Sequence, residues 1–175
     1  MKQKIVPYVL ALTMSTAGLT AMAASPAQWQ AMTNNLQVSL DQALQSAVQA
    51  VPGTVIEIEL DDGKGQVRYE AEILTPAGES VEVWVNGTSG QAYIHERNGK
   101  AKRKDAERVQ TAKIDMPTAI KAATAHTPGK PVKAELDNHW GTTTYQIDVL
   151  QPDFTVMELK VDAANGTVLR AKKDH

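Results

Sequence analysis

The chain repeats itself at a distance of 76 residues. Residues 39–94 align with residues 115–170 without a gap, and 14 of the 56 aligned pairs are identical. The identities fall at turns and at apolar positions of regular spacing, and they include the pairs Pro52/Pro128, Gly53/Gly129, Leu60/Leu136 and Tyr69/Tyr145. Turns and apolar periodicity specify a fold, so we predict that the two segments fold as the same unit.

Each copy is predicted to begin with a helix. Ser39 suits the N-cap position because its hydroxyl can accept from an unpaired amide of the first turn. It precedes an apolar stripe at helical spacing, which consists of Leu40, Ala43, Leu44, Ala47 and Val48. Asp115 takes the cap position in the second copy, where the stripe is Met116, Ala119, Ile120 and Ala123. A Pro-Gly pair ends both helices.

After each Pro-Gly pair the apolar period changes to two, which indicates strands. The apolar rows of the first copy are Ile56/Ile58/Leu60, Val67/Tyr69/Ala71/Ile73 and Val81/Val83/Val85, and those of the second are Val132/Ala134/Leu136, Tyr145/Ile147/Val149 and Met157/Leu159/Val161. We predict an α+β fold of two tandem repeats, each a helix packed on a three- to four-stranded antiparallel sheet. Residues 91–96 and 167–171 are the candidate fourth strands. Because a 56-residue unit buries little surface, the copies should pack together or join their sheets.

Residues 1–23 have the features of a secretory signal peptide. Lys2 and Lys4 precede an apolar run, and Ala21-Met22-Ala23 forms a small-residue cleavage site. The run is short of the roughly 20 residues of a spanning helix. With no cysteine, the chain can carry neither a disulfide nor a lipid on a Cys. We therefore expect a bacterial periplasmic or secreted protein without a stable membrane anchor after cleavage.

The remaining segments differ in charge and composition. Residues 24–38 are predicted to form a leader helix, residues 95–114 a solvated basic connector, and residues 171–175 a tail. The first copy carries 9 acidic and 2 basic residues, whereas the connector carries 3 acidic and 7 basic residues. Without residues 1–23 the net charge is −4, which argues against a nucleic-acid partner.

The two copies resemble the PepSY domain. The resemblance rests on "ALQSAVQAVPG", "VIEIEL", "VRYEAEIL" and "VEVWVNGTSGQAY" in the first copy and on "AIKAATAHTPG", "YQIDVL" and "LKVDAANGTVL" in the second. It covers about two thirds of the chain. It implies a noncatalytic exported module of the kind found in metalloprotease propeptides and in free-standing proteins that inhibit or regulate peptidases. It supplies no catalytic residues. Asn86-Gly87 departs from the family's Asp-Ala, and Lys133 stands where the first copy has Glu57.

No catalytic, cofactor-binding or metal-binding motif is evident, so we predict a protein that is not an enzyme. His95, His126, His139 and His175 lie in the connector, a helix end, a hairpin and the tail, without the spacing of a ligand pair. The chain has no Gly-x-Ser-x-Gly elbow and no cysteine nucleophile.

The best candidate site is a protein-binding face on the first copy. Strand alternation should direct one set of side chains away from the apolar rows, namely Glu57, Glu59, Glu70, Glu72, Glu82 and Trp84. Such a face can be an ordinary solvated sheet surface, or it can bind another protein through an exposed tryptophan beside charges. Trp140 is a further candidate, either as an exposed anchor or, as we favour, as a side chain packed against the first copy.

Two functions follow from these observations. The first is an exported noncatalytic protein that binds an envelope or secreted protein, such as a peptidase that it inhibits or regulates. Two copies would then supply a broader surface or two attachment points. The alternative is a periplasmic carrier that binds a small ligand or a metal in a cleft between the copies.

Overall fold

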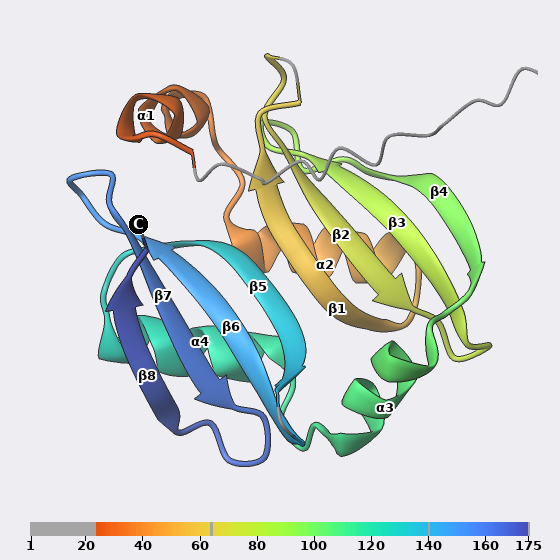
Figure 1. Cartoon of the computed structure of the whole chain (residues 1–175). Coiled ribbons are helices and arrows are strands. Elements are labelled where there is room, and N and C mark those ends of the chain that lie inside the picture. The colour runs from red at the N-terminus through yellow and green to blue at the C-terminus, as the bar shows by residue number, and fades with distance from the viewer. Residues whose placement is uncertain (1–23, 64, 140, 175) are drawn as a thin grey trace, which may run out of the picture.

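The two copies form one continuous antiparallel sheet. The computed structural model describes residues 24–63, 65–139 and 141–174. Eight strands lie in the order β4-β3-β2-β1-β5-β6-β7-β8, so the first copy supplies one half of the sheet and the second copy the other (Figure 1). The strands are β1 (Thr54–Asp61), β2 (Arg68–Leu74), β3 (Glu79–Asn86), β4 (Ala92–Lys100), β5 (Lys130–His139), β6 (Thr142–Leu150), β7 (Val156–Asp162) and β8 (Val168–Lys173). The predicted α+β architecture is confirmed, and β4 and β8 are the fourth strands.

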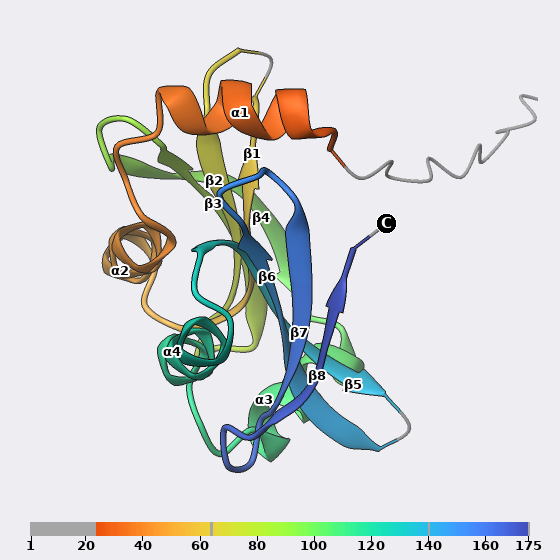
Figure 2. The same ribbon diagram turned by 90° about the vertical axis from the view of Figure 1, so that its left-hand side faces the viewer.

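Two of the four helices in the described part of the chain, α2 and α4, cover one face of this sheet, and α1 and α3 lie at its ends (Figure 2). The helices are α1 (Pro26–Asn34), α2 (Leu40–Ala50), α3 (Arg103–Thr111) and α4 (Met116–His126). Helices α2 and α4 lie side by side on one face, as both views show (Figures 1 and 2). The opposite face is called the open face below. The predicted signal peptide and Trp140 lie outside the described residues.

The predicted helix starts are confirmed. The Ser39 hydroxyl accepts from the Gln42 amide at 3.2 Å, and the Gln42 side chain accepts from the Ser39 amide at 2.8 Å. The Asp115 carboxylate accepts from the Thr118 amide at 3.0 Å. These bonds satisfy first-turn amides that the helix leaves unpaired. Both helices then bury their predicted stripes against the strands, except Val48, which is 38% exposed.

The copies are joined edge to edge at the middle of the sheet. Strands β1 and β5 pair antiparallel, with Ile58 opposite Ala134 and Glu59 opposite Lys133. Ile58 and Ala134 are themselves equivalent under the 76-residue shift, so the two halves are related by a pseudo-twofold axis through this pair. Most residues of the predicted apolar rows are buried beneath α2 and α4 in one shared core; Val67 and Met157 are partly buried against it, and Ile56 is buried outside it. Joining the sheets buries surface of both small units that each unit would leave exposed if it folded alone.

The structural repeat begins earlier than the sequence repeat. Helix α3 occupies the place in the second half that α1 occupies in the first, and the two lie at opposite ends of the molecule (Figures 1 and 2). The amides of Gln37 and Val38 donate to the Gly87 carbonyl, and the equivalent amides of residues 113 and 114 donate to the carbonyl of residue 163. Tyr69 and Tyr145 donate to the carbonyls of residues 38 and 114 at 2.8 and 2.9 Å.

The solvated connector predicted for residues 95–114 is therefore corrected by the structure. Its first part continues β4, and its second part forms α3. Arg108 of α3 binds Asp105 at 3.2 Å and Asp137 of β5 at 3.0 Å. Only 15% of the Arg108 side chain is exposed. The basic composition concealed this helix because its charged residues pair with acids of the helix and of the sheet.

Candidate functional site: the open face of the first repeat

Five glutamates form a continuous row across the open face. Each lies directly opposite the next on neighbouring strands, in the order Glu96 (β4), Glu82 (β3), Glu72 (β2), Glu57 (β1) and Glu135 (β5). Like charges placed directly opposite each other destabilise a sheet. This glutamate row is therefore maintained at a cost in folding stability, which a purely structural surface would avoid.

Lys133 neutralises the row where the two repeats meet. Its Nζ lies 2.9 Å from Glu57, 3.2 Å from Glu59 and 3.8 Å from Glu135. Burial would lower the pKa of Lys133, but the hydrogen bond and charge of Glu57 and the charge of Glu59 outweigh burial and raise it. Burial also raises the pKa of Glu135, and the charge of Glu57 adds to this effect. Lys133, which replaces an acid of the first copy at the equivalent position, thus supplies the positive charge that pairs with the acids of the first copy.

The predicted acidic residues surround a pocket of about 470 Å³. Its lining comprises Glu57, Glu59, Glu70, Ala71, Glu72, Ser80, Glu82, Asn98, Lys100, Ala101 and Lys102. The structure therefore brings together, on adjacent strands, all five glutamates of the predicted binding face. Residues of β4 and those just before α3 complete the lining of the pocket. Glu72 accepts from the Ser80 hydroxyl at 2.6 Å, which holds its carboxylate over the sheet.

Trp84 is also on this face, but it is not the freely exposed anchor that the sequence predicted. The Arg68 guanidinium lies 3.7 Å from the centroid of its ring, and the His95 ring stacks against it with centroids 3.5 Å apart. The indole Nε1 donates to Glu82 at 2.6 Å. Arg68 in turn donates from Nε to Glu70 at 2.7 Å. Because both ring faces are covered, Trp84 organises the surrounding side chains, and only part of the ring can contact a partner.

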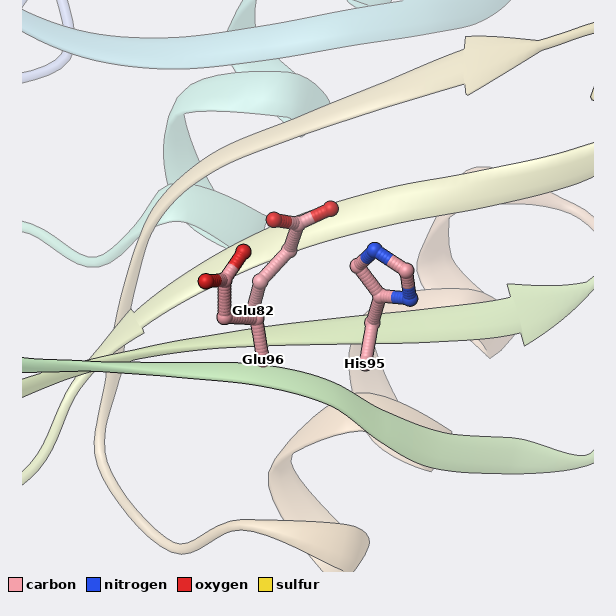
Figure 3. A group of neighbouring side chains, drawn as sticks. All are labelled: Glu82, His95 and Glu96. Atoms are coloured by element: carbon pink, nitrogen blue, oxygen red, sulfur yellow. The ribbon is translucent and has the colours of Figure 1, made fainter.

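Two residues next to the predicted site were missed by sequence reasoning. His95 and Glu96 are exposed on β4, and their side chains rise on the same side of the strands as Glu82 (Figure 3). Adjacent strand residues normally point to opposite faces. A bulge between Glu82 and Val83 inserts His95 as the extra residue of β4. Strand alternation gives no signal for this arrangement, because the bulge is a feature of the pairing between β3 and β4.

The open face of the second repeat differs in charge. The glutamate row continues beyond Glu135 as Gln146, Lys160 and Arg170. Burial raises the pKa of Asp148 to about 7, while the charge of Lys133 opposes this effect. Asp148 and Glu158 also lie opposite each other on this face, but Lys133 and Lys172 flank them, so the second repeat has no uninterrupted row of carboxylates among its described residues.

A groove crosses the other face between α2 and α4. It has a volume of about 1270 Å³ and is lined by residues of both repeats. Leu44, Val48 and Val55 contribute from the first repeat, and Ile120 and Tyr145 from the second. This is the cleft between the copies that a carrier would require, and it is more apolar than the pocket on the open face.

Comparison with known proteins identifies the family. The model of the peptidase propeptide and YPEB domain, PepSY, matches residues 37–92 and 113–172, about two thirds of the chain. The protein therefore belongs to the PepSY family and contains two PepSY domains in tandem. No curated protein matches the sequence.

Two solved structures resemble the chain. The Clostridium difficile 630 protein CD1622, described as a lipoprotein candidate, is 18% identical with a TM-score of 0.46, over 82% of this chain and 97% of that one. The YpmB protein from Bacillus subtilis is 16% identical with a TM-score of 0.36, over 77% and 97%. In the described part of the chain, none of the helices has the length and apolar character needed to cross a bilayer.

Proposed function

We propose that this protein is an exported, noncatalytic PepSY protein that binds a basic region of an envelope or secreted protein through the open face of its first repeat. The glutamate row carries this proposal. Aligned carboxylates destabilise the free sheet, and a partner that places Lys or Arg side chains over them relieves that repulsion. The pocket of about 470 Å³ provides a concave surface in which such side chains can approach several carboxylates at once.

Inhibition or regulation of a peptidase is the version that the family favours. The family description names peptidase propeptides, which connects this kind of domain with peptidases. In this chain the glutamate row lies on the first repeat and ends at the seam, whereas lysines flank the acids of the second repeat, so we assign partner binding to the first repeat. The second repeat completes the sheet and supplies Lys133 to the seam. A location in the periplasm or outside the cell follows from the predicted signal peptide.

The proposal is tested with bait proteins from which carboxylates are removed either on the open face or away from it. Glu59→Gln and Glu72→Gln together remove two carboxylates from the pocket. Glu79→Gln is the matched control, because Glu79 begins the same strand as Glu82 but lies on the opposite side by strand alternation. Envelope extract passed over each immobilised bait is analysed by mass spectrometry, and captured peptidases are then assayed with the free protein.

The wild-type and Glu79→Gln baits should retain the same partner. The doubly substituted bait should bind it at least about 10-fold more weakly at low salt, since electrostatic recognition is sensitive to both charge and ionic strength. Capture that is indifferent to the two glutamates and to salt would contradict the proposed face. A captured partner without peptidase activity would leave the binding face intact and exclude the peptidase version.

The groove between α2 and α4 supports a second candidate function, that of a carrier for a small apolar ligand. Its volume of about 1270 Å³ exceeds the usual range for small-ligand sites, and residues of both repeats line it. Native mass spectrometry of the protein purified from the envelope would detect such a ligand as a mass that is lost on unfolding. Substituting Val48 by Glu should abolish that mass while leaving partner capture by the open face unchanged.

A further inference from the structure

Three side chains at the edge of the open face converge as the ligands of a metal ion do. One potential ligand atom from each of Glu82, His95 and Glu96 lies within 4.8 Å of the other two (Figure 3). Ligand atoms about 2.0–2.2 Å from a shared ion lie no more than about 4.4 Å apart. The exposed His95 and Glu96 side chains can cover the remaining distance by small rotations.

The bulge in β4 is what creates this convergence. It makes His95 the inserted residue, so His95 and Glu96 both face Glu82. In the second repeat the corresponding bulge lies between Lys160 and Val161 instead. There Ala171, the equivalent of His95, pairs regularly with Leu159. The imidazole and the bulge that aims it are therefore both particular to the first repeat.

The second repeat shows what neutralises this position when no ion is needed. Glu158 is the equivalent of Glu82, and the residue opposite it is Lys172, the equivalent of Glu96. Lys172 Nζ lies 3.2 Å from the Glu158 carboxylate. In the first repeat two carboxylates face each other instead, and none of the described lysines or arginines forms an ion pair with either of them. In the second repeat a lysine thus balances the charge of Glu158. In the first repeat the equivalent position holds Glu96, which adds a second negative charge beside Glu82.

Trp84 holds two of the three side chains in place. Its indole nitrogen donates to one carboxylate oxygen of Glu82, which leaves the other oxygen available. Its ring stacks on His95 at an interplanar angle of 9°. Residues that orient ligands in this way raise metal affinity, because less freedom is lost when the ion binds.

We propose that Glu82, His95 and Glu96 form a binding site for a divalent first-row transition metal ion, such as Zn²⁺. An imidazole with two carboxylates suits these ions, whereas Ca²⁺ and Mg²⁺ prefer oxygen ligands throughout. Three protein ligands leave at least one coordination position for water or for a partner's side chain. The site lies on the first repeat and not in the groove between α2 and α4, and it does not depend on the proposed protein partner.

Calorimetric titration with Zn²⁺ tests the site in tag-free protein purified after export. Wild-type protein should bind one ion per chain at this site, and saturating Zn²⁺ should raise its Tm by about 5 °C relative to EDTA. His95→Ala should weaken the binding at least about 10-fold. His126→Ala, which removes an exposed histidine of α4, is the control and should leave the binding unchanged.

Glu96→Lys gives an independent test that does not rely on losing a ligand alone. It reproduces the Glu158–Lys172 arrangement, so the metal-free variant should have a higher Tm than the metal-free wild type, and Zn²⁺ should no longer raise it. Zn²⁺ affinity that is equal in wild type, His95→Ala and Glu96→Lys would overturn the proposal. Stabilisation by Ca²⁺ that survives His95→Ala would overturn the assignment to transition metals.

Discussion

Replacing Lys133 by methionine should destabilise the protein through the glutamate row. Methionine retains an apolar stem of similar length but removes the charge, so the change isolates the electrostatic contribution. Glu57, Glu59 and Glu135 would then face one another without the ammonium group that lies 2.9–3.8 Å from them. Because all three belong to strands at the seam, the effect should fall on the pairing of the two repeats.

The geometry sets the size of this effect. At an effective dielectric constant of about 20, each of the three contacts is worth about 4–6 kcal/mol before solvation is considered. The side chains are 25–44% exposed, however, and exposed pairs retain about 1 kcal/mol or less each after screening and desolvation. We therefore expect a loss of about 2 kcal/mol in the free energy of unfolding, which corresponds to a fall in Tm of about 6 °C.

Urea unfolding followed by circular dichroism at pH 7 and at pH 3 provides the measurement. The raised pKa of Lys133 means that its stabilising contribution is fully present below its ordinary pKa and is lost only as the pH rises through the raised value. At neutral pH the contribution is therefore complete. Acidification to pH 3 favours the neutral carboxyl form, most of all at Glu135 with its raised pKa, so wild type and Lys133→Met should differ less than at pH 7.

A matched substitution separates this reasoning from a general effect of removing a lysine. Lys160→Met also removes a positive charge from the open face, at a position without an ion pair among the described residues, and should change stability by less than about 0.5 kcal/mol. Lys133→Met combined with Glu57→Gln should recover part of the loss. A loss of the same size at pH 7 and pH 3, or no recovery in the double variant, would refute the electrostatic argument.

Three further changes test the buried groups and a turn. Asp148→Asn should raise the free energy of unfolding by about 2 kcal/mol at pH 8 and have little effect near pH 4. The reason is that the raised pKa of Asp148, about 7, makes the wild type lose stability as the pH rises from about 4 to 7; parallel pH-stability curves would contradict it. Tyr69→Phe should cost about 1–2 kcal/mol, because it leaves the buried Val38 carbonyl without its donor at 2.8 Å, and chemical denaturation measures this loss. Gly78→Ala should cost about 1 kcal/mol, because Gly78 has φ 79° and an added Cβ would meet no neighbour, so only backbone strain opposes it; an unchanged Tm would show that the turn relaxes.

Local patterns in the sequence were sufficient for much of the fold. The capping residues Ser39 and Asp115 act within one helical turn, so their roles follow from the residues around them. The apolar rows follow from strand alternation, which also placed Glu57, Glu59, Glu70, Glu72, Glu82 and Trp84 on one face. The 76-residue repeat then indicated that the two halves share these features, because the same local rules apply to both.

Contacts between distant segments decided the rest. The pairing of β1 with β5 brings Lys133 to glutamates 76 and 74 residues earlier in the chain, and no local pattern records that register. The bulge that aims His95 at Glu82 depends on how β4 pairs with β3. The shielding of Trp84 by Arg68 and His95 requires three strands to be in place at once. Alternation states which face a side chain occupies, but only the register between strands determines which charges and rings meet there.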